Sequence, residues 1–136
     1  MATGTSLSDY LENEILDHII GASSWSAPAT LYFALYTSAP SDAGGGTEVT
    51  GGGYARVSKT NNLTNFPAAS AGSKSNANDI DFGTASADWG TITHVAVLDA
   101  ASSGNLLFWG ALTASKTVQN GDGFKFLATK LVFSLD

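Results

Sequence analysis

The alternation that decides the fold class begins at Leu31, in the stretch Leu31-Tyr-Phe-Ala-Leu-Tyr36. Leu31, Phe33 and Leu35 fall on one face of an extended segment and the tyrosines fall on the other, which is the period of two typical of a β-strand. A second strong strand is predicted over residues 91–99, which are rich in Thr, Ile and Val. The two stretches together indicate a β protein.

Shorter strands are predicted where brief runs of apolar residues are bounded by glycine or asparagine turns. They cover residues 54–59, 80–84, 106–112, 116–118 and 124–135. Two hairpins are expected, one joining 91–99 to 106–112 and one across the turn Asn120-Gly-Asp-Gly123. Residues 42–53 and 61–78 are interpreted as long loops. The pattern predicts a flexible arm over residues 1–5 and then one domain over residues 6–136, an antiparallel β-sandwich with one N-terminal α-helix.

The helix is predicted before these strands, capped by Ser6 or Ser8 and stopped by Gly21. A helix of about 13 residues is marginal alone. Its apolar stripe must therefore dock either on the sheet of this domain or on a neighbouring chain. The stripe consists of residues spaced three and four apart: Leu7, Leu11, Ile15, Leu16, Ile19 and Ile20.

Charge is distributed unevenly along the chain. The 136 residues include 12 acidic and 6 basic side chains, for a net charge of −6, and no Lys or Arg precedes Arg56. A nucleic-acid-binding protein needs a clustered basic face, so that class is excluded. The N-terminal acidic residues have two readings, a solvated surface or a patch that meets a basic partner. On the helix they are Asp9, Glu12, Glu14 and Asp17.

Neither a membrane span nor a secretory leader is expected. The uncharged segment 21–41 is interrupted by serines and a proline, and its apolar run has only the length of a strand. The N-terminus lacks a basic region followed by an apolar one. Cysteine is absent, which excludes disulfides and thiolate metal sites.

No arrangement of residues predicts catalysis, and the chain is not expected to be an enzyme. His18 and His94 stand alone, and no serine lies in a nucleophile motif. Asp79 and Asp81, with Asn76 and Asn78 nearby, could bind Ca²⁺. The favoured reading is instead a solvated strand entry, so neither a metal nor a cofactor is predicted.

A partner contact is predicted for the glycine-rich loop, residues 42–53, which is costly to order because it contains two glycine triplets. The loop is expected to be either mobile or held by a partner. Aromatic residues are enriched at interfaces, and arginine suits paired hydrogen bonds with carboxylates. The candidate interface residues outside the helix are therefore Tyr54, Arg56 and Trp89.

Five segments resemble small virion proteins of tailed bacteriophages. They are residues 7–18, 28–36, 42–56, 87–94 and 106–112, which include Gly51-Gly-Gly-Tyr-Ala-Arg56 and Asp88-Trp-Gly90. Such chains are commonly labelled tail fibre or structural proteins, and the resemblance implies a β-rich, non-enzymatic virion component.

The first functional reading is a capsid cement protein, a homotrimer that binds the major capsid protein and stabilises the head. The alternative is a fibre module that binds a host receptor. Both readings place the chain in the virion, with the capsid surface expected first and the tail second.

Overall fold

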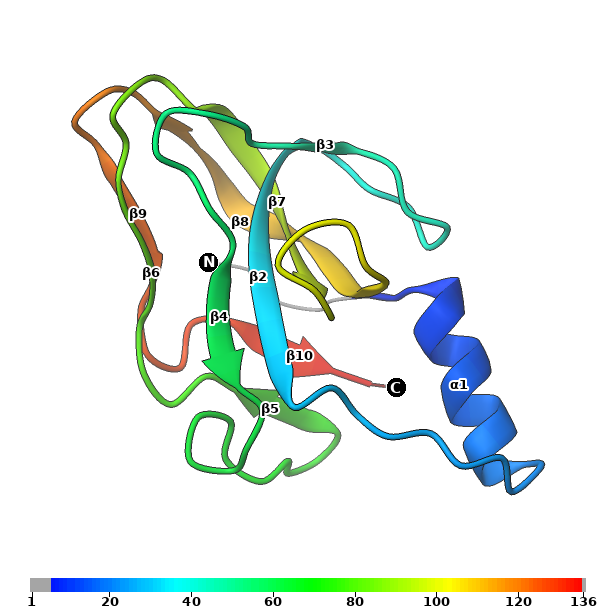
Figure 1. The fold of residues 1–136 in the computed structure, drawn as a ribbon. Helices are drawn as coiled ribbons and strands as arrows, with labels where there is room; N and C mark the ends of the chain where they lie inside the picture. Colours follow the sequence, from blue (N-terminus) through cyan, green and yellow to red (C-terminus); the bar gives the residue numbers. More distant parts are fainter. Residues whose placement is uncertain (1–5, 136) are drawn as a thin grey trace.

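The computed structural model describes residues 6–135, so the expected arm over residues 1–5 and the terminal Asp136 lie outside the described residues. The described chain is mainly β, with a single helix (Figure 1). In chain order the elements are β1 (Ser6–Leu7), α1 (Asp9–Ile19), β2 (Thr30–Ser38), β3 (Thr47–Glu48), β4 (Val57–Thr60), β5 (Ser73–Ser75), β6 (Ile80–Thr84), β7 (Gly90–Leu98), β8 (Leu106–Val118), β9 (Gly123–Phe126) and β10 (Val132–Ser134).

The main sheet has the strand order β1-β8-β7-β2-β3, and β4 also pairs with β2. Its strand pairs are antiparallel, and Phe33 of β2 stands opposite Val97 of β7. The predicted alternation is confirmed, since Phe33 and Leu35 enter the main core while Ala34 and Tyr36 join a smaller cluster. β7 and β8 form the first predicted hairpin.

Two short strand pairs, β6 with β9 and β5 with β10, face the main sheet across the core (Figure 1). The core is apolar on both sides, because phenylalanines from β6 and β9 meet the inward residues of β2 and β7. The prediction of an antiparallel, mainly β fold with one helix is thus confirmed, and the arrangement is sandwich-like. The core residues of the smaller pairs include Ile80, Phe82, Phe124 and Phe126.

The second predicted hairpin is wrong. β8 runs unbroken to Val118, and its last residues pair with the start of β7. After the turn at 119–122 the chain leaves the main sheet, and Phe126 of β9 pairs with Ile80 of β6. A turn signal identifies the change of direction, but burial of Phe124 and Phe126 decides which strand is the partner.

The segment 61–78 is not entirely loop, because it contains β5. The sequence Ser73-Lys-Ser75 has almost no β propensity, so the missed strand is an effect of tertiary structure. β10 supplies the partner, with Phe133 opposite Lys74. The predicted incorporation of the C-terminal segment into a sheet is confirmed through Ser134.

Helix α1 begins where the sequence predicts, with Ser8 as its N-cap. The Ser8 hydroxyl accepts a hydrogen bond from the Leu11 amide and donates one to the Leu106 carbonyl. The helix lies on the right of Figure 1, against β1 and β8. Leu11 is the residue of α1 that becomes fully buried in this contact.

Candidate interaction surface

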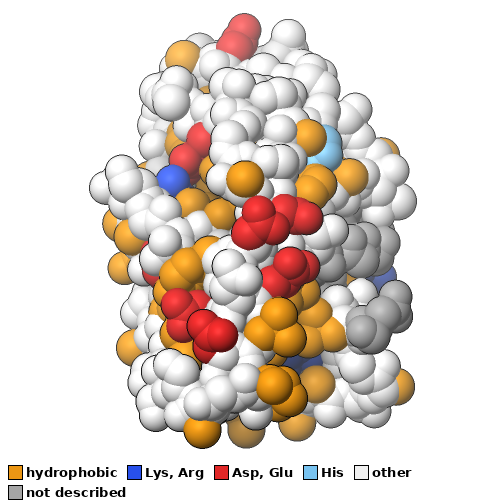
Figure 2. All heavy atoms as spheres, turned by 90° about the vertical axis from the view of Figure 1, so that its right-hand side faces the viewer, with side chains coloured by type: hydrophobic (Ala, Val, Ile, Leu, Met, Phe, Trp, Pro, Cys, Tyr) orange, Lys and Arg blue, Asp and Glu red, His pale blue; other side chains and the backbone are white. Residues whose placement is uncertain are grey.

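The face of the molecule that carries α1 shows a band of carboxylates with hydrophobic side chains on both sides (Figure 2). Asp9, Glu12 and Asp17 are exposed and Glu14 is half-buried. None of them forms an ion pair within residues 6–135, where the salt bridges are Arg56–Glu48 and Lys125–Asp79. Their charge is therefore available to a partner.

The end of α1 leaves three apolar side chains in solvent. Leu16 is 59% exposed, Ile19 67% and Ile20 78%, whereas Leu11 of the same stripe is 3% exposed. The sequence left open whether the stripe docks on this domain or on another chain. The structure divides it, because Leu11 and Ile15 pack on the core whereas Leu16, Ile19 and Ile20 stay mostly exposed.

An apolar cavity of about 240 Å³ lies beside α1 and extends this surface. We call the four carboxylates, the three exposed apolar residues and this cavity the α1 surface. Sequence reasoning missed the cavity, because its walls come from distant parts of the chain that no local pattern connects. Its lining includes Leu11, Ile15, Trp25, Leu31, Phe108 and Phe133.

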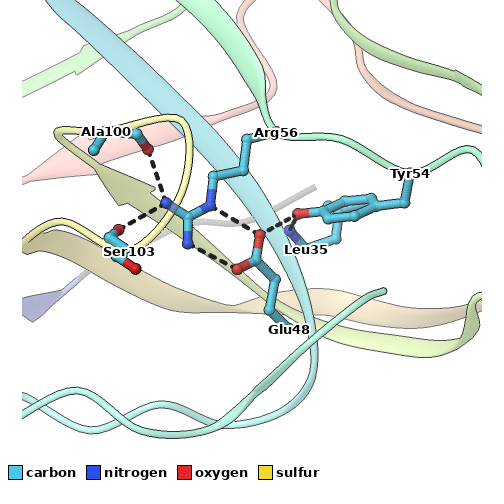
Figure 3. A network of polar contacts seen from close by, with 6 residues as sticks. All are labelled: Leu35, Glu48, Tyr54, Arg56, Ala100 and Ser103. Carbon is cyan, nitrogen blue, oxygen red and sulfur yellow. Dashed lines mark hydrogen bonds and ion pairs between the residues drawn. The ribbon is translucent and has the colours of Figure 1, made fainter. Parts of the chain in front are cut away.

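Glu48, Tyr54 and Arg56 form a network that joins three segments (Figure 3). Arg56 donates from Nε to Oε2 of Glu48 at 2.9 Å and from Nη2 to Oε1 at 2.8 Å. Its Nη1 donates to the carbonyls of Ala100 and Ser103, at 2.8 and 2.9 Å. The Arg56 side chain is 9% exposed and that of Glu48 is 23% exposed, so water screens the pair only weakly.

The Tyr54 hydroxyl completes the network. It donates to Oε2 of Glu48 at 2.7 Å and accepts from the Leu35 amide at 3.0 Å. Burial alone would raise the pKa of Glu48, but hydrogen bonds from Arg56 and Tyr54, with the charge of Arg56, hold it below its ordinary value. Burial raises the pKa of Tyr54, so the phenol stays neutral as a donor.

Trp89 lies in the core, 5% exposed, with its ring edge-on to Tyr54. Its indole Nε1 donates to the carbonyl of Gly52 at 2.8 Å, and the Ser86 amide donates to the same oxygen. The glycine-rich loop was expected to be mobile or held by a partner. The structure shows a third case, in which contacts within the chain hold the loop.

The predicted interface residues thus separate into two groups. Asp9, Glu12, Glu14 and Asp17 lie together on the α1 surface. Tyr54, Arg56 and Trp89 instead bond to the backbone and side chains of their own fold. The contact of this second group with a partner stays a prediction.

The acidic residues near β6 have partners within the chain. Asp79 accepts from the Ala128 amide and Asp81 from the Gly83 amide, while Asn76 bonds three backbone groups. Within residues 6–135 no three His, Cys, Asp or Glu side chains gather as metal ligands would. These contacts are consistent with the favoured interpretation of Asp79 and Asp81 as solvent-exposed residues at the start of a strand.

His94 is half-buried, and its Nδ1 lies 2.8 Å from the Thr93 hydroxyl. Burial lowers its pKa.

Across the described chain, α1 is the helix present, and it has neither the length nor the apolar character of a membrane span.

Comparison with known families gives a match that covers nearly the whole described chain. Residues 6–134 match the family described as "Podophage GP4 fiber I protein gp80". The match supports the resemblance of the sequence to phage virion proteins. No curated protein matches the chain.

Proposed function

The chain belongs to the podophage GP4 fiber I protein gp80 family, and we propose that it is a structural subunit of a virion fibre. It docks through the α1 surface on a virion protein that carries Lys and Arg around an apolar contact. The observation that carries this proposal is the unpartnered last turn of α1, where Leu16, Ile19 and Ile20 project into solvent beside unpaired carboxylates.

The energetics of α1 support a docked state. Exposed single apolar residues are common, but here Leu16 and Ile19 of the last turn and the C-cap Ile20 lie within five residues of one another. They belong to the same segment as Leu11 and Ile15, which line the apolar cavity. Each Leu or Ile side chain that becomes buried contributes about 1.5–3 kcal/mol to association. The same residues contribute little to folding, because the fold leaves them in solvent.

Charge identifies the kind of partner. The helix carries four carboxylates and no Lys or Arg, so a partner with an acidic contact face would be repelled. A basic rim would pair with the carboxylates and increase the rate of encounter at low salt. We therefore propose a virion protein with a basic docking face rather than a second copy of α1.

The family match favours a fibre subunit over a capsid cement protein, the function that was expected first from the sequence. The expected homotrimer is retained as part of the proposal, since trimeric contacts can form on faces other than the α1 surface. We propose a structural role and no enzymatic one. Binding of a host receptor by the fibre is a separate question from docking.

Incorporation into virions tests the docking role. Phage is produced with the double variant Ile19→Ser/Ile20→Ser, and the amount of this chain per purified particle is compared with wild type by quantitative mass spectrometry. We expect at least a tenfold loss. The control is Leu63→Ser, because Leu63 is 66% exposed and lies outside the α1 surface. Equal incorporation of both variants would contradict the proposal.

A further inference from the structure

We propose that the chain binds a neutral saccharide in a cup on the outer face of the main sheet, a site that goes beyond the structural role proposed above. The cup is a cavity of about 410 Å³. Its walls are the start of α1, the loop at 42–45 and the turn at 103–106, and its floor includes Tyr36 and Leu98. It is separate from the apolar cavity of the α1 surface.

Tyr36 carries the inference. The residue is 7% exposed and packs with Ala34, Ala96 and Leu98, yet its hydroxyl has no hydrogen-bond partner among residues 6–135. Buried tyrosine hydroxyls normally find a partner, because an unsatisfied polar group in the interior lowers stability. Here the unpartnered hydroxyl belongs to a residue that lines an open cup, where a ligand group can hydrogen-bond to it.

The walls of the cup are fixed by hydrogen bonds. The backbone carbonyl of Asp42 accepts a hydrogen bond from the Asp9 amide at 2.9 Å. The side-chain Oδ1 of Asp42 accepts one from Nε1 of Trp109 at 2.8 Å. Arg56 holds the turn at 103–106 through the Ser103 carbonyl, and Ser8 holds it through the Leu106 carbonyl. A ligand therefore meets a preformed site and loses little affinity to ordering of the protein.

The charges in the cup disfavour an anionic ligand. Asp9 and Asp42 contribute carboxylates, whereas the charge of Arg56 is already matched by Glu48. An anion would be repelled by the carboxylates and would find no unmatched cation. A metal ion would lack a third acidic or histidine ligand among the described residues.

Sugar hydroxyls fit this set of groups. Each hydroxyl can donate to a carboxylate and accept from a phenol, as Asp42 and Tyr36 require. The ring of Tyr10, which is half-buried in the wall, offers an apolar surface for the face of a sugar ring. At Gly44 and Gly45 nothing lies within 4 Å of where a Cβ would stand, so the rim is open to a ligand.

The test uses the isolated full chain labelled with ¹⁵N. Neutral hexoses, N-acetylhexosamines, deoxyhexoses and their short oligomers are titrated to millimolar concentrations while backbone amide shifts are recorded. We expect saturable shifts at Tyr36, Gly44, Gly45, Gly104 and Asn105. The absence of shifts at these amides with the whole panel, or shifts confined to other surfaces, would overturn the inference.

A matched pair of variants tests the role of the hydroxyl. Tyr36→Phe keeps the ring and should weaken saccharide binding at least fivefold. Tyr32→Phe, on the same strand and the same face but outside the cup, should leave binding unchanged. Equal affinity of the two variants would overturn the inference. A uronic acid must bind more weakly than its neutral hexose, and tighter binding of the acid would also overturn it.

This test is independent of docking. It is carried out on the isolated chain, whereas the docking proposal is tested by incorporation into virions. A chain that enters fibres and binds no saccharide would contradict the cup alone. A chain that binds saccharides and is absent from fibres would contradict the docking role alone.

Discussion

Arg56 and Glu48 form a two-pronged ion pair, in which Nη2 lies 2.8 Å from Oε1 and Nε lies 2.9 Å from Oε2. The pair joins β3 to the segment that leads into β4, and the remaining guanidinium nitrogen extends to the turn after β7. One side chain thus fixes two loops that border the proposed cup (Figure 3).

Replacing Glu48 tests the energetic weight of this network. At pH 7, Glu48→Gln should lower the free energy of unfolding by about 2 kcal/mol, because it leaves a buried guanidinium without its counter-ion. Urea unfolding measures the change. The control is Asp79→Asn, which removes the exposed pair with Lys125 and should cost less than about 0.5 kcal/mol.

The same variant has a defined pH dependence. The folded-state pKa of Glu48 lies below its ordinary value of 4.5, so ionised Glu48 stabilises the fold fully above that value. This contribution is lost as the pH falls through the folded-state pKa. The difference in stability between wild type and Glu48→Gln should therefore shrink below pH 4.5. A difference that grows on acidification would show that the pKa is shifted in the opposite direction.

Replacing Arg56 with lysine keeps the positive charge but removes the planar guanidinium, which donates several hydrogen bonds at once. Because an ammonium cannot reach both carboxylate oxygens and two carbonyls, Arg56→Lys should loosen the loops at 41–49 and 99–105. We expect amide hydrogen exchange there to accelerate about tenfold, equivalent to 1.4 kcal/mol of local opening. Exchange in the paired centre of β7 and β8 is the internal control and should not change. Uniform acceleration would indicate global destabilisation instead.

Two neighbouring glycines provide a matched test of the glycine-rich loop. Gly51 and Gly52 both have positive φ, at 72° and 60°. A Cβ at Gly51 would meet nothing within 4 Å, whereas one at Gly52 would lie 2.8 Å from the Ala87 carbonyl oxygen. Gly51→Ala should therefore cost about 1 kcal/mol and Gly52→Ala about 3 kcal/mol in thermal or urea unfolding. Equal costs would mean that the loop does not hold its place against Trp89.

The carboxylates of α1 should act through long-range charge. Asp9, Glu12, Glu14 and Asp17 are replaced together by Asn or Gln, and binding of the isolated chain to particles that lack it is measured across salt concentrations. We expect weaker binding at low salt and a difference that disappears at high salt, because ions screen exposed charges. Unchanged binding at low salt would identify the band as ordinary solvated surface.

Local chemistry accounts for the parts of the fold that the sequence predicts. The alternation at 31–36 and the Ser8 cap each depend on neighbouring residues, and both appear in the structure. β5 and the pairing of β9 with β6 depend on burial among distant segments, so no window of sequence contains the information. The acidic residues of α1 could also be predicted, because they belong to one short segment of sequence.

The cup and the apolar cavity could not be predicted. Tyr36 looks like any outward residue of a strand until loops from two other parts of the chain enclose it. Trp89 was proposed as an interface residue from its type alone, yet the fold uses its indole to hold Gly52. The type of a residue indicates which contacts its side chain can make, but the fold determines which residues it contacts.

The number and position of copies in the virion test the central claim most directly. Quantitative gel or mass-spectrometric analysis of purified particles gives the copy number, and gold-labelled antibodies against this chain give the location. A fibre subunit should be present in tens of copies at most, with label on fibres. Hundreds of copies distributed over the head would contradict the fibre account and support a capsid cement protein.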